Sequence, residues 1–415
     1  MNKNTITLLV CLSIIYRTFT PLSYFFEGGQ AFVMLVPVVV LYFWGNLYNS
    51  RSFNIAAVIS LFPLLLAHWG VEYFQGYLPD SISLLFAIGC IDYYLRTDDD
   101  QFAKYSLSAL YGSLFLLAFI SLPFLIAEPG LNRTFHSMKA EGLEVPVYSY
   151  FTISYAMVHA VPILVIPLFF LYKSAESKLS KVLLIAAIVS LYVTTILSNA
   201  STPMFMLLMY VLFVLIYNPE QPLSRNAIKI AGVLFLVFIL YYSGLIISFL
   251  ESFQAWVRGT MQESRIDEVI SFLENGETEG DMNEREDRYN ISLDAFLSHP
   301  LSPEYNINNI GKHSYLIDHL AAMGLIAFIP FALLLFYQYR MPLKYLGNEK
   351  GYYIMAYSAF IFLACVKNFF VAESAMFICP ALLIYTRRRL SSIEDDEDDE
   401  DNDIEEDIED SLEAQ

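Results

Sequence analysis

The sequence predicts an all-α polytopic membrane protein with about 12 transmembrane helices and one long extracytoplasmic loop. The chain has 415 residues, of which 56% are hydrophobic and 16% charged. The apolar residues come in blocks of about 20, the length that a helix needs to cross the hydrocarbon core of a bilayer. Because backbone in lipid must form its own hydrogen bonds, repeated blocks of this length predict helices.

The expected spans follow one another closely through most of the chain. They fall near residues 4–22, 30–48, 54–74, 79–95, 104–127, 149–172, 179–198, 203–217, 228–250, 314–337, 351–369 and 371–386. The predicted division is residues 1–250 with nine helices, residues 251–313 as the extracytoplasmic loop, residues 314–390 with the last three helices, and residues 391–415 as a disordered acidic cytoplasmic tail.

The basic residues predict the orientation. With both termini in the cytoplasm, the inner side holds 15 of the 24 lysines and arginines, and every short inner loop carries some of them. The net charge of −19 comes mostly from the C-terminal end, since Glu394–Gln415 holds 15 of the 43 acidic residues and no basic one. The rest of the chain has 24 basic and 28 acidic residues, a net charge of −4. The tail therefore predicts a solvated end, with docking to a basic partner as an alternative.

The long polar loop is expected to contain two short helices. Ser264–Asp267 resembles a capping box and opens a helix that ends near Gly276. The polar segment 277–286 should be mobile. A second amphipathic helix, Tyr289–Ser298, should lie on the membrane surface with Arg288 at its start, where a helix N-terminus and a guanidinium together favour an anion.

Arginines predominate among the basic residues expected outside. Arg258, Arg265, Arg285 and Arg288 lie in the long loop. Arginine suits sites that hold phosphate or carboxylate in two places. Any one of the four could instead pair with an acidic residue of the loop, an interpretation that explains the set less well. Arg17, near the outer end of the first span, either extends to the interface or joins the same site.

Some ionisable residues fall inside apolar runs. His68 and Glu72 are four residues apart and should share one face of the third span, as an interfacial pair or as a proton relay. His159 stands alone in the sixth span and is expected to be a hydrogen-bonded core histidine. No zinc spacing, phosphate-binding glycine loop or nucleophile elbow is present, so neither metal nor cofactor is predicted.

With this topology, the segment Arg288–Gly324 resembles the bacterial O-antigen polymerase and O-antigen ligase superfamily. The matching features run in order from Arg288 through a short helix to a His-Pro-Leu sequence, a glycine, a His-Ser pair and a Leu-x-x-x-Gly sequence. They are Arg288, Ala295, His299-Pro300-Leu301, Gly311, His313-Ser314, Leu320 and Gly324. The chain departs from the pattern at Ser302-Pro303, at Ser314, and at Ser201-Thr202-Pro203, where the family often carries an arginine.

The resemblance implies polymerisation of undecaprenyl diphosphate-linked repeat units on the outer face of the bacterial inner membrane, without metal or nucleotide. Its partners would be that lipid-linked glycan, membrane lipid and other polysaccharide-assembly proteins, with no nucleic acid. Arg288 and Arg285 would stabilise the leaving diphosphate and His313 would act as the base. Arg258, Arg265, Arg17 and His319 are the expected substrate-binding residues. There are two alternatives. One is a ligase that transfers the finished glycan from the lipid carrier to an acceptor, and the other is a transporter of polysaccharide or lipid-linked sugar.

Overall fold

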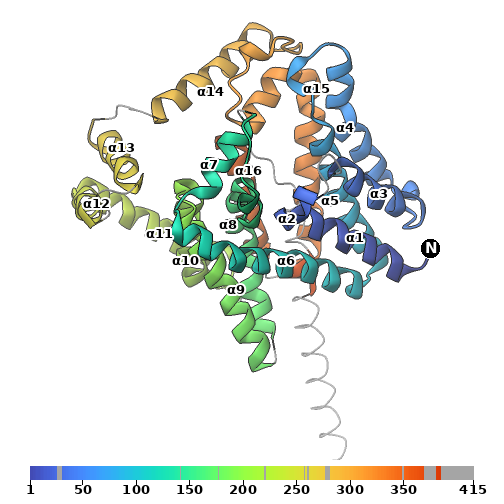
Figure 1. Ribbon diagram of the computed structural model, residues 1–415, viewed down its shortest axis with the longest axis horizontal. Coiled ribbons are helices and arrows are strands. Elements are labelled where there is room, and N and C mark those ends of the chain that lie inside the picture. Colours follow the sequence, from blue (N-terminus) through green and yellow to red (C-terminus); the bar gives the residue numbers. More distant parts are fainter. Residues whose placement is uncertain are drawn as a thin grey trace, which may run out of the picture.

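The computed structural model describes all residues except 26–29, 141, 176, 219–220, 257, 259–260, 276–280, 348–349, 369–379 and 385–415. Within these described ranges every regular element is a helix (Figure 1). The predicted acidic tail and most of the twelfth predicted span lie outside the described residues.

The α-helices vary from short turns to full membrane length. In order they are α1 (Lys3–Thr18), α2 (Thr20–Phe25), α3 (Gln30–Phe43), α4 (Arg51–His68), α5 (Leu78–Thr97), α6 (Asp100–Ala127), α7 (Leu131–Ala140), α8 (Tyr155–Ser174), α9 (Lys178–Leu197), α10 (Ser201–Ile216), α11 (Leu223–Tyr242), α12 (Leu245–Trp256), α13 (Met261–Asn275), α14 (Asp281–Ser298), α15 (Tyr315–Arg340) and α16 (Lys350–Val366). Five 3-10 turns lie between them: η1 (Leu47–Asn49), η2 (Glu72–Phe74), η3 (Val147–Phe151), η4 (Ile307–Asn309) and η5 (Pro342–Lys344).

Seven helical segments among the described residues are long and apolar enough to cross a membrane. They are Arg51–His68, Leu78–Thr97, Asp100–Ala127, Val147–Phe169, Lys178–Leu197, Ser224–Tyr242 and Tyr315–Lys344. Four shorter apolar helices accompany them, at Phe32–Phe43, Ser201–Ile216, Leu245–Ala255 and Lys350–Val366. The chain is thus a helical protein of membrane type, while the number of 12 spans stays a prediction.

Serine and aspartate side chains begin many of the long helices. Ser50, Asp99, Ser154, Ser177 and Ser314 each accept a hydrogen bond from a backbone N–H in the first turn of α4, α6, α8, α9 and α15. Such caps satisfy donors that a helix leaves unpaired at its N-terminus, so short polar residues between apolar runs fix where each helix starts.

The interior of the bundle is formed mainly by α5 and α8, each of which lies in a candidate span whose apolar window is 78% buried. The window in α11, by contrast, is only 6% buried, so this helix presents its apolar surface outward, as a lipid-facing helix does. The core is one continuous hydrophobic cluster, with a small second cluster around Leu125, Leu131 and Phe135.

The third predicted span is wrong at its C-terminal end. Helix α4 stops at His68, and Gly70 follows with φ of +96°, a conformation that glycine adopts readily and that terminates helices. Glu72 therefore lies in η2, and His68 and Glu72 do not share a helix face. Glu72 instead holds a distant loop, because its carboxylate accepts a hydrogen bond of 3.3 Å from the N–H of Ile307.

The polar segment after α11 also differs from its prediction. Helix α13 contains the first expected helix, but α14 begins at Asp281 and not at Tyr289, so Arg288 lies inside the helix and not at its N-terminus. The acidic residues near the start of α14, together with the pair of Glu284 and Arg288 one turn apart, favour this longer helix. In Figure 1, α14 leads to α15 at one end of the bundle, and α12 and α13 lie at the edge.

Candidate functional site

The candidate site lies where the polar segment joins α15. Residues Ile310–Ser314 connect η4 to this helix, and Ser314 is its N-cap. The Ser314 hydroxyl donates 3.4 Å to the carbonyl of Ala364 near the end of α16, and the N–H of Tyr315 donates 3.0 Å to the carbonyl of Lys367. The loop that carries His313 is therefore fixed between α15 and the end of α16.

A buried carboxylate organises this loop. Asp318, 1% exposed, accepts 2.6 Å from the hydroxyl of Ser292 on α14 and 3.0 Å from the N–H of Ser314. The Ser292 oxygen in turn accepts 2.8 Å from the N–H of Gly311. A charged group with several donors around it forms strong hydrogen bonds in a dry environment, so Asp318 ties α14, the loop and α15 together.

Sequence reasoning missed Asp318. The available signal was its position four residues after the capping Ser314, in the first turn of α15, where acidic side chains meet unpaired N–H groups. Ser292 carried no signal of its own, because its partner is 26 residues further along the chain.

Two glycines of the Arg288–Gly324 motif are packing positions. A Cβ atom on Gly311 would lie 1.8 Å from the carbonyl oxygen of Arg288, so only glycine allows the loop to contact the α14 backbone. Gly324 has φ of +64°, and a Cβ there would lie 2.7 Å from the carbonyl oxygen of Ser302. The N–H of Leu325, next to this kink in α15, donates 2.9 Å to the carbonyl of Pro300. The His-Pro-Leu turn is thereby attached to α15.

His313 is partly buried in a cationic environment. Burial, and then the positive charges of Lys367, Arg285 and Arg288, lower the pKa of His313 to about 4, against an opposing effect of Glu284. The imidazole is therefore neutral at neutral pH. Its Nε2 atom is buried and forms no hydrogen bond with the described part of the chain, so its capacity to donate or accept a proton is unused there.

Tyr289 fixes one side of the His313 ring. The two rings meet edge to face with centroids 5.4 Å apart, and the Tyr289 hydroxyl donates 2.9 Å to the carbonyl of Val366. Tyr289 therefore connects α14 to the end of α16 beside His313. The pKa of the Tyr289 hydroxyl is raised, first by burial, which keeps the phenol protonated as a donor.

The cations around His313 come from two parts of the chain. Arg285 and Arg288 lie on α14, and Lys367, only 9% exposed, follows α16. The Arg288 side chain is 43% exposed and pairs with Glu284 at 2.5 Å. These three positive charges favour the binding of an anion, such as a phosphate group, next to His313.

The structure places Arg17 in a neighbouring cavity of about 230 Å³ formed by the ends of α1 and α2, by α7, and by the segment from η3 into α8. His136 and Tyr155 also line this cavity, with ring centroids 5.7 Å apart. Tyr155 contacts His159 at 4.8 Å, and His159 interacts electrostatically with both Lys367 and Arg285. His159, which lies beside Tyr155, is thus influenced by two of the cations that act on His313.

Other predicted site residues are not part of this arrangement. The Arg258 side chain is 81% exposed and its nearest carboxylate in the described part of the chain is Glu263, at 3.9 Å. Arg265 lies on α13, which packs against α12, and its side chain is outside the described residues. His319 is fully enclosed, with Tyr315 stacked at 3.9 Å and Phe74 among the surrounding rings. The roles predicted for these residues stay predictions.

The described residues contain no group of three or more His, Cys, Asp or Glu side chains placed to hold a metal ion. Comparison with protein-family models, with curated proteins and with solved structures finds no match for this chain. The functional argument therefore depends on the geometry around His313 and on the chemistry of its neighbours.

Proposed function

We propose that the protein is a membrane glycosyltransferase that joins lipid-linked oligosaccharide units, with a polyprenyl diphosphate such as undecaprenyl diphosphate as the carrier. The observation that carries the proposal is a neutral, half-buried histidine beside three cations, Lys367, Arg285 and Arg288, at the junction of α14 and α15. The junction opens the longest apolar helix after the polar segment, so a lipid headgroup in this place is close to its membrane-embedded tail.

The cations suit the departure of a diphosphate. When the bond between the anomeric carbon and the diphosphate oxygen breaks, negative charge grows on the leaving group. Three cations, Arg285, Arg288 and Lys367, would stabilise that charge, and stabilisation of this kind is commonly the largest contribution to catalysis. The polyprenyl diphosphate then leaves as an anion, and the glycan passes to the acceptor.

His313 suits the role of base for the acceptor hydroxyl. A new bond forms between the acceptor oxygen and the anomeric carbon, and the hydroxyl proton passes to the imidazole. Burial, and then the nearby cations, hold the pKa of His313 at about 4. A bound diphosphate offsets those charges and should raise the pKa of His313 toward 6.5, so the imidazole becomes a stronger base only when donor is present.

Substitution of the two central residues tests the proposal. In cells, His313→Ala and Arg288→Ala variants that still reach the membrane should lower polysaccharide formation by a factor of about 100 or more, the size expected for loss of a general base or a charge-stabilising group. His299→Ala is the matched control, because this exposed histidine lies in the same segment and outside the His313 surroundings. Normal polysaccharide from both site variants would refute the assignment.

The unused substrate then identifies the reaction. Loss of a polymerase leaves single repeat units at the cell surface, whereas loss of a ligase leaves complete chains on the carrier lipid. Conversion of a lipid-linked glycan by the purified protein, without a partner, separates either enzyme from a transporter.

A further inference from the structure

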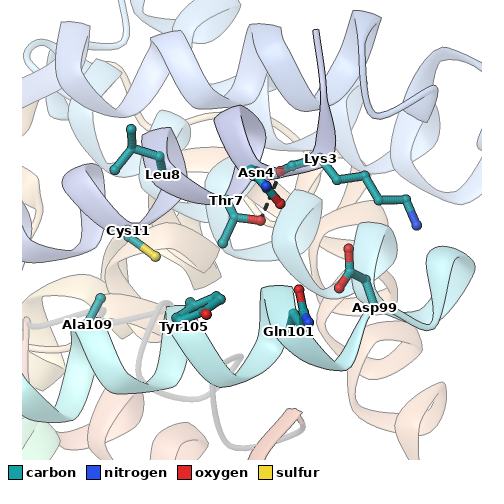
Figure 2. A pocket seen from close by; sticks show the side chains of 9 residues that line it. All are labelled: Lys3, Asn4, Thr7, Leu8, Cys11, Asp99, Gln101, Tyr105 and Ala109. Atoms are coloured by element: carbon teal, nitrogen blue, oxygen red, sulfur yellow. Dashed lines mark hydrogen bonds between the residues drawn. The ribbon is translucent and has the colours of Figure 1, made fainter.

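A hollow of about 620 Å³ lies between α1 and the start of α6, at the opposite end of α1 from Arg17. Four of its residues, Lys3, Asn4, Asp99 and Gln101, form one end of the hollow. Figure 2 shows side chains of the two helices facing each other across it. This hollow shares no residue with the Arg17 cavity and is independent of the function proposed above.

The lining of the hollow changes from polar to apolar along both helices. On α1 it runs from Lys3 and Asn4 to Leu8 and Cys11, and on α6 the apolar side includes Tyr105 and Ala109. At 1.5 Å per residue, the eight-residue separation along each helix corresponds to about 12 Å, which accommodates a charged headgroup and the start of an apolar chain. Leu8 and Tyr105 are 58% and 60% exposed, so they offer apolar surface along this path.

The polar end carries two opposite charges, those of Lys3 and Asp99. The structure shows no ion pair between Lys3 and Asp99, although both line the same hollow. We propose that this hollow binds a zwitterionic phospholipid with a primary ammonium headgroup, phosphatidylethanolamine. Lys3 would bind the phosphate, Asp99 the ammonium, and the surface of Leu8 and Tyr105 the first part of an acyl chain.

Charge complementarity favours this lipid over an anionic one. Phosphatidylglycerol also offers a phosphate to Lys3, but its glycerol headgroup has no cation for Asp99. Lys3 should therefore strengthen the binding of both lipids, whereas Asp99 should discriminate between them. A carboxylate at the Asp99 position is not required by the fold, because it caps α6 through an oxygen that accepts 3.0 Å from the N–H of Phe102, and asparagine caps helices equally well.

Native mass spectrometry of the full-length protein in detergent, titrated with an equimolar mixture of phosphatidylethanolamine and phosphatidylglycerol, tests the proposal. Among protein molecules with one bound lipid, the ratio of phosphatidylethanolamine to phosphatidylglycerol should be roughly two to five. This is the discrimination that an exposed ion pair supports. Asp99→Asn should bring the ratio near one, and Lys3→Gln should weaken both lipids. Lys104→Gln is the control, since this exposed lysine lies on α6 outside the hollow. A wild-type ratio near one, or a ratio that Asp99→Asn leaves unchanged, overturns the proposal.

The natural thiol of Cys11 reports whether the lipid occupies this hollow. In a protein with Cys365→Ala and Cys379→Ala, the remaining cysteines are Cys11, which lines the hollow, and Cys90, which is 2% exposed. Phosphatidylethanolamine should slow maleimide labelling of Cys11 in this background, and Asp99→Asn should restore the rate measured in detergent alone. Equal labelling with and without phosphatidylethanolamine would show that the lipid binds elsewhere and would refute the site.

Discussion

The two parts of the polar segment have similar patterns of charged residues and very different surroundings. Both carry two arginines among acidic residues, Arg258 and Arg265 in the first part and Arg285 and Arg288 in the second. The first part packs on α12 at the edge of the molecule, and Arg258 is 81% exposed. The second part is tied to α15 through buried hydrogen bonds around Asp318, and to the end of α16 through the hydroxyl of Tyr289. Equal arginine content therefore does not make two equal anion sites, since only the second pair lies beside His313.

The largest loss of stability should follow from a side chain placed between the His313 loop and the backbone of α14. Gly311→Ala places a methyl group against the Arg288 carbonyl, so the loop must move, and the free energy of unfolding in detergent should fall by about 3 kcal/mol or more. Gly112→Ala on α6 is the control, because its Cβ meets nothing within 4 Å and alanine favours helix. Equal stability of the two variants would mean that the loop is not held tightly against the α14 backbone.

Loss of the central carboxylate should have the next largest effect. Asp318→Asn weakens the bonds to Ser292 and to the N–H of Ser314, and should lower the free energy of unfolding by about 2 kcal/mol, as expected for buried hydrogen bonds to a charged group. The exposed Asp294→Asn change on α14 should stay within about 0.5 kcal/mol. Denaturant titration of the purified protein measures both, and a loss no larger than that of the control would contradict the role given to Asp318.

A smaller effect concerns the titration of His313. Lys367→Met removes a positive charge and should raise the pKa of His313 from about 4 toward 6.5, although burial, the larger cause, remains. Glu284→Gln should lower the pKa further, because Glu284 raises it. Selective ¹³C labelling of the six histidines allows NMR titration of each variant. A His313 pKa that does not respond to either change would separate this residue from the cations.

The lowered pKa of His313 also predicts how the free energy of unfolding depends on pH. Unfolded His313 binds a proton below about 6.5, whereas the folded form stays neutral down to about 4. The unfolded state therefore binds more protons between these values, and stability should fall as pH decreases from 6.5 to 4. Lys367→Met should narrow the pH range over which stability falls. Comparison of the free energy of unfolding at pH 7 and at pH 5 can detect this change.

The smallest effect is expected at Arg258. Its exposed contact with Glu263 at 3.9 Å contributes little, so Arg258→Ala should change the free energy of unfolding by less than about 0.5 kcal/mol. The proposed polysaccharide formation should stay within about twofold of wild type, the factor that corresponds to the ~0.5 kcal/mol typical of surface substitutions. A large loss of activity with unchanged stability would show that the first part of the segment also reaches the substrate.

The sequence by itself determined the class of this protein and the place of its polar segment. Blocks of apolar residues and the polar residues that cap them are local signals, because helix length and N-cap chemistry depend on neighbours in the chain. For the same reason the two helices of the segment were predictable in kind. The start of α14 and the end of α4 were predicted wrongly, although the features that mark them are also local: the pair of Glu284 and Arg288 one turn apart, and the glycine at position 70.

Only the tertiary structure decided which polar residues meet. Lys367 joins Arg285 and Arg288 around His313, and Asp318 meets Ser292, from segments that are separate in the sequence. The structure also encloses His319 in aromatic rings, although it follows His313 by only six residues. Electrostatics and burial act through space and not along the chain, so residue type and spacing could suggest the cations and the histidine but could not assemble them.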